Sequence, residues 1–172
     1  MGPTTYPQGA NSEISPLTSL KLKISDQARI LVVSDDDLIA ERLNIVLREA
    51  GFLSERARSI TAGCESARSG QFQVVISAPL LNDGSWRRLV DIAAYYDLGF
   101  VVILVATAFD IQDWAEALED GAFDVLDALD ELPKIAKSAK GAAWAAYLKG
   151  AGQRTEAIGP LRAAGRAQLT EA

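Results

Sequence analysis

Carboxylates are the side chains in this sequence with the clearest potential for chemistry, and they gather at two places. A triplet, DDD at 35–37, follows the apolar run ARILVVS, and the motif DGS at 83–85 follows the run QVVIS. Carboxylate oxygens are the ligands that Mg²⁺ prefers, and crowded carboxylates repel one another until a cation joins them. The first triplet therefore predicts either a residual cation site at Asp35 and Asp36 or a helix cap at Asp36 or Asp37. For DGS the alternative to a functional role is a structural one, in which the motif forms a turn and a helix cap.

Composition removes several kinds of chemistry at once. The chain of 172 residues has no histidine, which excludes Ser-His and Cys-His nucleophiles and the common zinc sites, and with them most hydrolases. We expect that the protein is not an enzyme. Cys64 is the single cysteine, which favours a reducing, cytoplasmic setting and a place in the core. The net charge of −6 argues against a nucleic-acid partner, because it would repel a phosphate backbone.

No segment of the sequence predicts contact with a membrane. The longest apolar run, at 99–109, is shorter than the roughly 20 residues that a membrane-spanning helix needs. The amino-terminal segment shows no basic stretch followed by an apolar one, so no signal peptide is expected. We therefore expect neither a membrane partner nor secretion.

Changes in composition divide the chain into three parts. Residues 1–27 mix Pro, Gly, Ser and Thr and predict a flexible leader, in which LTSLKLKI is a weak candidate for an edge strand. Residues 28–149 form one globular domain, and residues 150–172 predict a flexible or partly helical tail.

Within residues 28–149, short apolar runs alternate with segments of helical periodicity. The expected strands are ARILVVS, LSERA, QFQVVIS, GFVVILVATA and AFDVLD, the fourth being apolar throughout and so buried on both faces. The expected helices lie at 35–51, 59–69, 85–96, 110–121 and 130–148. The first helix presents one apolar face made of Leu38, Ile39, Leu43, Val46 and Leu47. Five such βα units predict an α/β fold, a flavodoxin-like (βα)5 doubly wound parallel sheet.

Three segments resemble the CheY-like receiver domains of response regulators in two-component, phosphorelay signalling. They are RILVVSDDDLIAERLNIVLREAGF, VVISAPLLNDGS and ALEDGAFDVLDAL, and the likeness covers residues 29–149. In that family two acids after the first strand and a phosphoacceptor Asp after the third hold Mg²⁺. A Thr or Ser ends the fourth strand, and a Lys followed by Pro ends the fifth. The metal and the Lys neutralise the phosphoryl oxygens while the Asp acts as the nucleophile.

This sequence departs from the family pattern at its functional positions. The positions correspond to Ser34 and Asp35 for the acid pair, Ala78 for the phosphoacceptor, Ala106 or its neighbour Thr107 for the hydroxyl, Ala128 for the Lys, Leu129 for the Pro and Val125 for the switch aromatic. Alanine cannot be phosphorylated. The resemblance therefore implies a degenerate pseudo-receiver with no cofactor and no metal, except for weak Mg²⁺ at Asp35 and Asp36.

A pseudo-receiver implies a phosphorylation-independent protein-protein interaction module, a signalling protein that binds a partner or itself. The expected surface is formed by the helix at 110–121, the strand at 122–127 and the last helix, with Trp114, Val125, Trp144 and Tyr147 as interface candidates. Trp86 has apolar neighbours at helical spacing, which predicts partial burial or an interface role.

Two alternative functions stay open at the level of the sequence. One is a flavodoxin-like nucleotide or flavin binder, although SDDD lacks the glycines of a phosphate-binding loop. The other is a conventional receiver with a displaced acceptor, which would be Asp83 or Asp35.

Overall fold

Five parallel strands form the centre of the protein. The computed structural model describes residues 28–167, with side chains described as far as residue 151, so the expected leader and its edge-strand segment lie outside the described residues. The strands of the main sheet are β1 (Arg29–Val33), β2 (Leu53–Ala57), β3 (Val74–Ser77), β6 (Val101–Ala106) and β7 (Ala122–Asp127). Their order is β2-β1-β3-β6-β7 and every pairing is parallel, which confirms the flavodoxin-like prediction.

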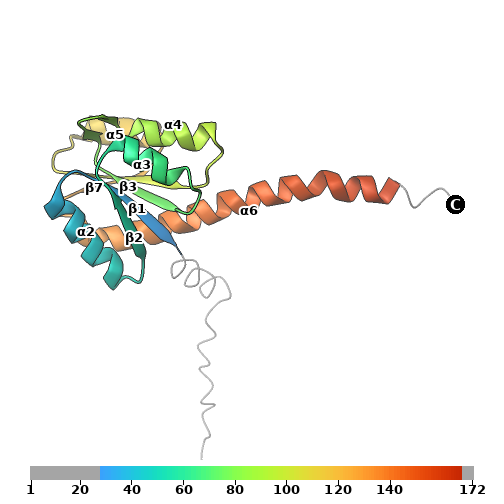
Figure 1. The fold of residues 1–172 in the computed structure, drawn as a ribbon, viewed down its shortest axis with the longest axis horizontal. Helices are drawn as coiled ribbons and strands as arrows, with labels where there is room; N and C mark the ends of the chain where they lie inside the picture. The colour runs from blue at the N-terminus through green and yellow to red at the C-terminus, as the bar shows by residue number, and fades with distance from the viewer. Residues whose placement is uncertain (1–27, 168–172) are drawn as a thin grey trace, which may run out of the picture.

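Helices cover both faces of the sheet (Figure 1). They are α2 (Asp37–Glu49), α3 (Ile60–Ala67), α4 (Arg87–Tyr95), α5 (Ile111–Glu119) and α6 (Ile135–Ala167), the last preceded by the 3-10 turn η1 (Leu132–Lys134). Figure 1 shows α3, α4 and α5 on one face of the sheet, and α2 and the first turns of α6 on the other. This is the doubly wound arrangement that the alternation of strands and helices predicts.

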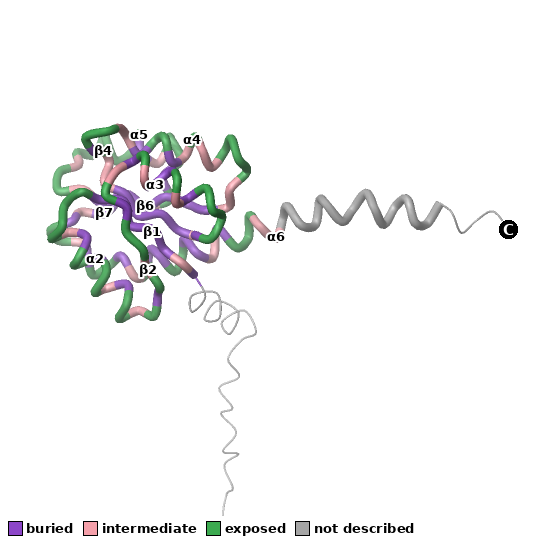
Figure 2. Tube along the Cα trace, viewed as in Figure 1, coloured by how far each residue is buried: buried purple, intermediate pink, exposed green. Residues whose placement is uncertain are grey.

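The core consists of two apolar layers, one on each face of the sheet. Alternate residues of β1 supply both: Ile30 and Val32 pack with α2 and α6, whereas Leu31 and Val33 pack with α3 and α4. Figure 2 shows the buried residues concentrated along the strands. Strand β6 is buried on both faces over Val101–Val105, as its continuous apolar run predicts.

Helix α2 confirms one prediction and corrects another. Asp36 is its N-cap, as expected, and its side chain accepts hydrogen bonds from the backbone N–H groups of Leu38 and Ile39. The buried residues of α2 are Ala40, Leu43 and Leu47. Leu38 is 62% exposed, so its assignment to the apolar face was wrong. Its place in the first turn carries it past the end of the sheet.

The last helix begins later and ends later than the sequence predicts. We expected it at 130–148, but η1 occupies the start of that range and α6 runs from Ile135 to Ala167. The residues expected to face the sheet are buried: Leu132, Ile135, Ala139, Ala142 and Ala146. Among the described residues, no helix is both long and apolar enough to cross a membrane.

The connection between β3 and α4 contains a feature that sequence periodicity does not reveal. Two short strands, β4 (Leu80–Leu81) and β5 (Gly84–Ser85), pair antiparallel in a tight ladder. Trp86 follows the ladder and is fully buried in the α3–α4 layer, which corrects the expected partial burial. The ladder turns the chain so that the indole enters the core.

Candidate functional site

The carboxyl ends of β1, β3, β6 and β7 bring the family positions together at one edge of the sheet. In the strand register Val33 lies beside Ser77, and Ala106 lies beside Asp127. The N–H of Ala78 donates to the carbonyl oxygen of Val33 at 3.0 Å, so Ala78 stands next to the β1 exit. We call this edge the carboxyl edge.

A pocket of about 320 Å³ opens at the carboxyl edge. Its lining comes from the ends of three strands and the loops that follow them: Val33, Ser34, Asp35, Asp36, Ile39, Leu43, Ile76, Ser77, Ala78, Pro79, Leu80, Val105, Ala106, Thr107 and Ala108. One cavity is therefore lined by the positions of the acid pair, the phosphoacceptor and the hydroxyl, and not by those of the Lys, the Pro and the switch aromatic. Its floor is apolar, and its acidic groups come from the β1–α2 loop alone.

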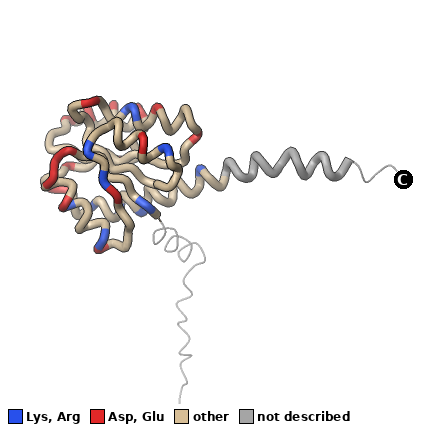
Figure 3. The backbone as a smooth tube through the Cα atoms, in the orientation of Figure 1, with Lys and Arg blue, Asp and Glu red and all other residues tan. Residues whose placement is uncertain are grey.

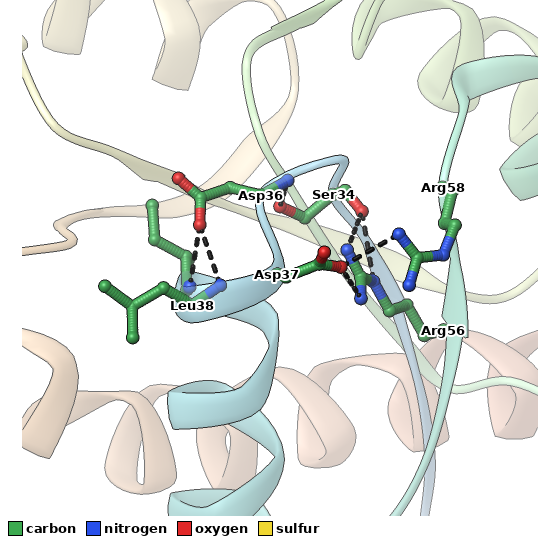
Figure 4. A network of polar contacts seen from close by, with 7 residues as sticks. Ser34, Asp36, Asp37, Leu38, Arg56 and Arg58 are labelled. Atoms are coloured by element: carbon green, nitrogen blue, oxygen red, sulfur yellow. Dashed lines mark hydrogen bonds and ion pairs between the residues drawn. The ribbon is translucent and has the colours of Figure 1, made fainter.

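Backbone bonds and arginines occupy much of the β1–α2 loop (Figure 4). The Oγ of Ser34 accepts from the N–H of Asp36 at 3.2 Å, and Arg56 donates to the carbonyl oxygen of Ser34 at 3.0 Å. Asp37 Oδ1 lies 2.7 Å from Arg56 and 2.8 Å from Arg58. The hydrogen bond from Arg56, and then the charge of Arg58, hold the pKa of Asp37 below its ordinary value. Asp37 thus points toward β2.

The expected cation site is reduced to one uncommitted carboxylate. Asp36 Oδ1 accepts two helix N–H groups at 2.9 and 3.0 Å, and Asp37 is paired with arginines. Asp35 is exposed at the pocket, and its side chain has no hydrogen bond or ion pair with any described residue. The side chains described here contain no group of three or more potential metal ligands. Weak Mg²⁺ binding at Asp35 and Asp36 stays a prediction.

Asp83 lies elsewhere and acts on a different helix from the one that we expected. Its two carboxylate oxygens accept from the backbone N–H groups of Ile60 at 2.9 Å and Thr61 at 2.8 Å, at the start of α3. These bonds, led by those from Thr61, lower its pKa to about 2. Helix α4, which follows the DGS motif, has no side-chain cap. Asp83 does hold the start of a helix, as expected, but the helix is α3 and not α4. The prediction failed because a contact between residues 22 positions apart leaves no local signal in the sequence.

The β6 and β7 exits carry no charged group into the pocket. Ala106 lines the pocket, and the N–H of Ala128 donates to its carbonyl oxygen at 2.8 Å. Ala128 itself is only 1% exposed and packs in the α2–α6 layer with Leu132 and Ile135. A methyl group thus stands where the resemblance predicts an ammonium.

The interface candidates differ in exposure: two are exposed, Trp144 is half-buried and Val125 is buried. Trp114 on α5 and Tyr147 on α6 are exposed, and the rings of Trp144 and Tyr147 stack with centroids 5.7 Å apart. Val125 is buried in the α3–α4–α5 layer, so it offers no side-chain surface, which corrects its inclusion. Phe123, an exposed aromatic on the edge strand β7, was not among the predicted interface residues. Its alternation with buried Ala122 was a usable signal.

Comparison with known proteins identifies the fold. No protein-family profile and no curated protein matches the chain. Among solved structures, the signal receiver domain of an HD domain-containing protein from Pseudomonas fluorescens has a TM-score of 0.64 at 21% identity, covering 72% of this chain and 92% of its own. A response regulator receiver domain protein from Clostridium thermocellum has a TM-score of 0.62 at 22% identity, covering 70% and 98%.

A third similar structure comes from a different kind of signalling protein. The signal receiver domain of a signal transduction histidine kinase from Syntrophus aciditrophicus has a TM-score of 0.59 at 25% identity, covering 67% of this chain and 89% of its own. The fold of the described chain is therefore that of CheY-like response-regulator receiver domains.

Proposed function

We propose that this protein is a pseudo-receiver: a receiver-fold signalling protein that does not accept a phosphoryl group and acts by binding a protein partner. The observation that carries the proposal is Ala78, whose methyl group lies at the β3 exit on the floor of the carboxyl-edge pocket. An alanine offers no oxygen to attack phosphorus. Ser34, Ala106 and Ala128 remove further charge and hydroxyl groups around it.

The surroundings of the acids argue against a displaced acceptor. Both oxygens of Asp83 are held by the N-terminus of α3, and Asp83 does not line the pocket. Asp35 lines it, but it has no neighbouring ammonium to offset phosphoryl oxygens there. The acidic loop after β1 also argues against a nucleotide or flavin phosphate, which would need backbone N–H groups and positive charge.

Treatment with acetyl phosphate and Mg²⁺, followed by intact mass measurement, tests the loss of phosphotransfer. We expect no added phosphoryl group and no rise in melting temperature at a few millimolar Mg²⁺, because a ligand stabilises only well above its dissociation constant. A phosphorylated protein would contradict the proposal, and peptide mapping would then distinguish Asp35 from Asp83.

The surface proposed for the partner, or for a second copy, is the side of the molecule at β7. Trp114, Phe123 and Tyr147 expose aromatic side chains there from α5, β7 and α6. The ring of Phe123 lies over Gly141, where a Cβ would stand 3.4 Å from it. Exposed aromatics supply contact area at low entropic cost and are enriched in interfaces.

Matched variants test this surface. We expect Trp114→Ala and Tyr147→Ala to reduce partner capture from the native cell extract, or to reduce self-association in sedimentation. Tyr95→Ala removes an aromatic that is also exposed, but on α4, and should change neither. Equal effects of Tyr95→Ala and Trp114→Ala would contradict the assignment of the surface.

A further inference from the structure

The carboxyl edge carries a group of exposed apolar side chains that the proposed function does not use. Leu38, Leu80, Ile111 and Leu129 follow β1, β3, β6 and β7 and are exposed by 62%, 74%, 86% and 67%. Since parallel strands end at the same edge, all four belong to the side of the molecule where the pocket opens, and Leu80 lines its mouth. We call these four residues the apolar rim. Single exposed leucines are ordinary, whereas a group around one pocket indicates an interaction site.

The loops that carry the apolar rim are also acidic. The segments 34–38, 78–85, 106–113 and 127–130 contain eight aspartates and no Lys or Arg: Asp35, Asp36, Asp37, Asp83, Asp110, Asp113, Asp127 and Asp130. Arginines compensate Asp37, and backbone N–H groups donate to Asp36, Asp83, Asp110 and Asp127. The others have no ion pair among the described side chains. Figure 3 shows the acidic run where β1 leads into α2. The negative electrostatic potential at the carboxyl edge attracts cations and repels phosphates.

The pocket inside the rim combines an apolar floor with an acidic mouth. Ile76, Ala78 and Val105 belong to the floor, and Asp35 stands exposed at the opening. A lysine or arginine side chain matches this arrangement, because its aliphatic stem packs on apolar atoms while its charged end stays near water and a carboxylate.

We propose that the carboxyl edge binds an amphipathic, basic segment of a partner protein, which lays apolar side chains on the rim and inserts a lysine or arginine into the pocket beside Asp35. Charge complementarity selects this partner over an acidic peptide or an anionic ligand. This surface lies at the strand ends and adjoins the β7 side proposed above on α5, where Ile111 and Trp114 are one helical turn apart.

The course of α6 favours a separate partner over the chain's own end. Lys149 lines a cavity with Leu98, Gly99 and residues at the start of β6, so α6 has reached the amino edge of the sheet by then. Any segment after residue 151 therefore starts at the edge opposite the pocket.

Binding of a labelled synthetic Leu/Lys amphipathic helical peptide to the full-length protein tests the proposal, with a Leu/Glu peptide and a Ser/Lys peptide for comparison. We expect only the Leu/Lys peptide to bind, with weaker binding at higher salt. Its amide shift changes should fall on 34–38, 78–81, 106–111 and 127–130.

Exposed positions allow matched variants that are expected to fold normally. Leu80→Ser should weaken binding at least about tenfold through lost apolar burial. Asp35→Asn should weaken it about two- to fivefold, the range for exposed ion pairs. Leu53→Ser, at a residue as exposed as Leu129 but at the amino edge, and Asp91→Asn on α4 should leave binding unchanged.

Three results would overturn the proposal. One is equal binding of the Leu/Glu peptide, and another is shift changes confined to the β7 side. The third is protection of the four loops in the protein alone, since that would identify its own chain or a second copy as the occupant.

Discussion

Asp83 matches the receiver pattern most clearly, yet its role in the structure is to hold another helix. Its two oxygens satisfy two of the N–H groups that the first turn of any α-helix leaves without an intrahelical partner. Ser59 caps the same helix by accepting from Ala62. The hydrogen bonds of Asp83 attach the β3–α4 connection, which begins at Ala78, to the start of α3.

Replacing Asp83 with asparagine should destabilise the protein and change its acid response. The pKa of Asp83 is about 2 in the folded state and ordinarily 3.8, so its stabilising contribution is complete above about pH 4. That contribution is lost as the pH falls through about 2. We expect Asp83→Asn to lower the melting temperature by a few degrees at pH 7. The gap from the wild type should close toward pH 2.

Thermal unfolding between pH 2 and pH 7 measures this effect. Asp91→Asn, an exposed aspartate on α4, is the control and should follow the wild type at every pH. A stability difference for Asp83→Asn that does not depend on pH would show that the charge of Asp83 does not contribute.

Residue-scale predictions from the sequence succeeded where the signal was local. Asp36 and Asp110 cap the helices that begin next to them, as their position before apolar periodicity indicates. Three features depend instead on contacts between elements: the helix that Asp83 holds, the pairing of Asp37 with Arg56 and the burial of Trp86. One sequence contains no signal for such contacts.

Helix α3 lies close to β1 because of a glycine. A Cβ on Gly63 would stand 2.8 Å from Cγ2 of Val33, which is fully buried. Gly63→Ala gains helix propensity, but it forces a core side chain to move, so we expect a net loss of about 1–3 kcal/mol.

Gly141 on α6 provides the matched comparison. There the new Cβ would meet the ring of Phe123 at 3.4 Å, an ordinary contact, and Gly141→Ala should stabilise by about 0.5–1 kcal/mol. Chemical denaturation of the two variants measures both changes. Equal effects of the two substitutions would refute the close packing of α3 on β1.

Strand β6 should be the most protected element in native-state amide exchange. It lies between β3 and β7, and Val101–Val105 are buried. The edge strand β2, with mostly exposed side chains, should exchange earlier. Mass spectrometry or NMR of the exchanging protein tests this order, and faster exchange in β6 than in β2 would contradict it.

The sequence predicted the secondary-structure elements better than the contacts between them. The period of two in strands and the period of 3.6 in helices come from backbone geometry, so they appear in any single sequence. The β4–β5 ladder is too short to show a period. Helix α6 passes the end that Gly150 and Gly152 indicate and continues into the tail, for which a flexible or partly helical structure was predicted.

At the scale of the whole molecule, the proposed loss of phosphotransfer is distributed over the ends of four strands, β1, β3, β6 and β7. Ala78→Asp alone restores a carboxylate beside Asp35 without a counter-charge. We expect it to raise the pKa of one of the two, to cost about 1 kcal/mol and to leave the protein unlabelled by acetyl phosphate.

The triple variant Ser34→Asp, Ala78→Asp, Ala128→Lys should regain Mg²⁺ binding and phosphorylation, because positioned charge supplies much of the rate in phosphoryl transfer. Ala128 is only 1% exposed and packs with Leu132 and Ile135, so these neighbours must shift for the Lys stem to carry its charged end to the pocket. Intact mass after acetyl phosphate treatment, together with the Mg²⁺ dependence of the melting temperature, compares the variants. Labelling of the single variant to the extent of the triple one would mean that Ala78 alone silences the site, and the charges at the other two strand ends would then be dispensable.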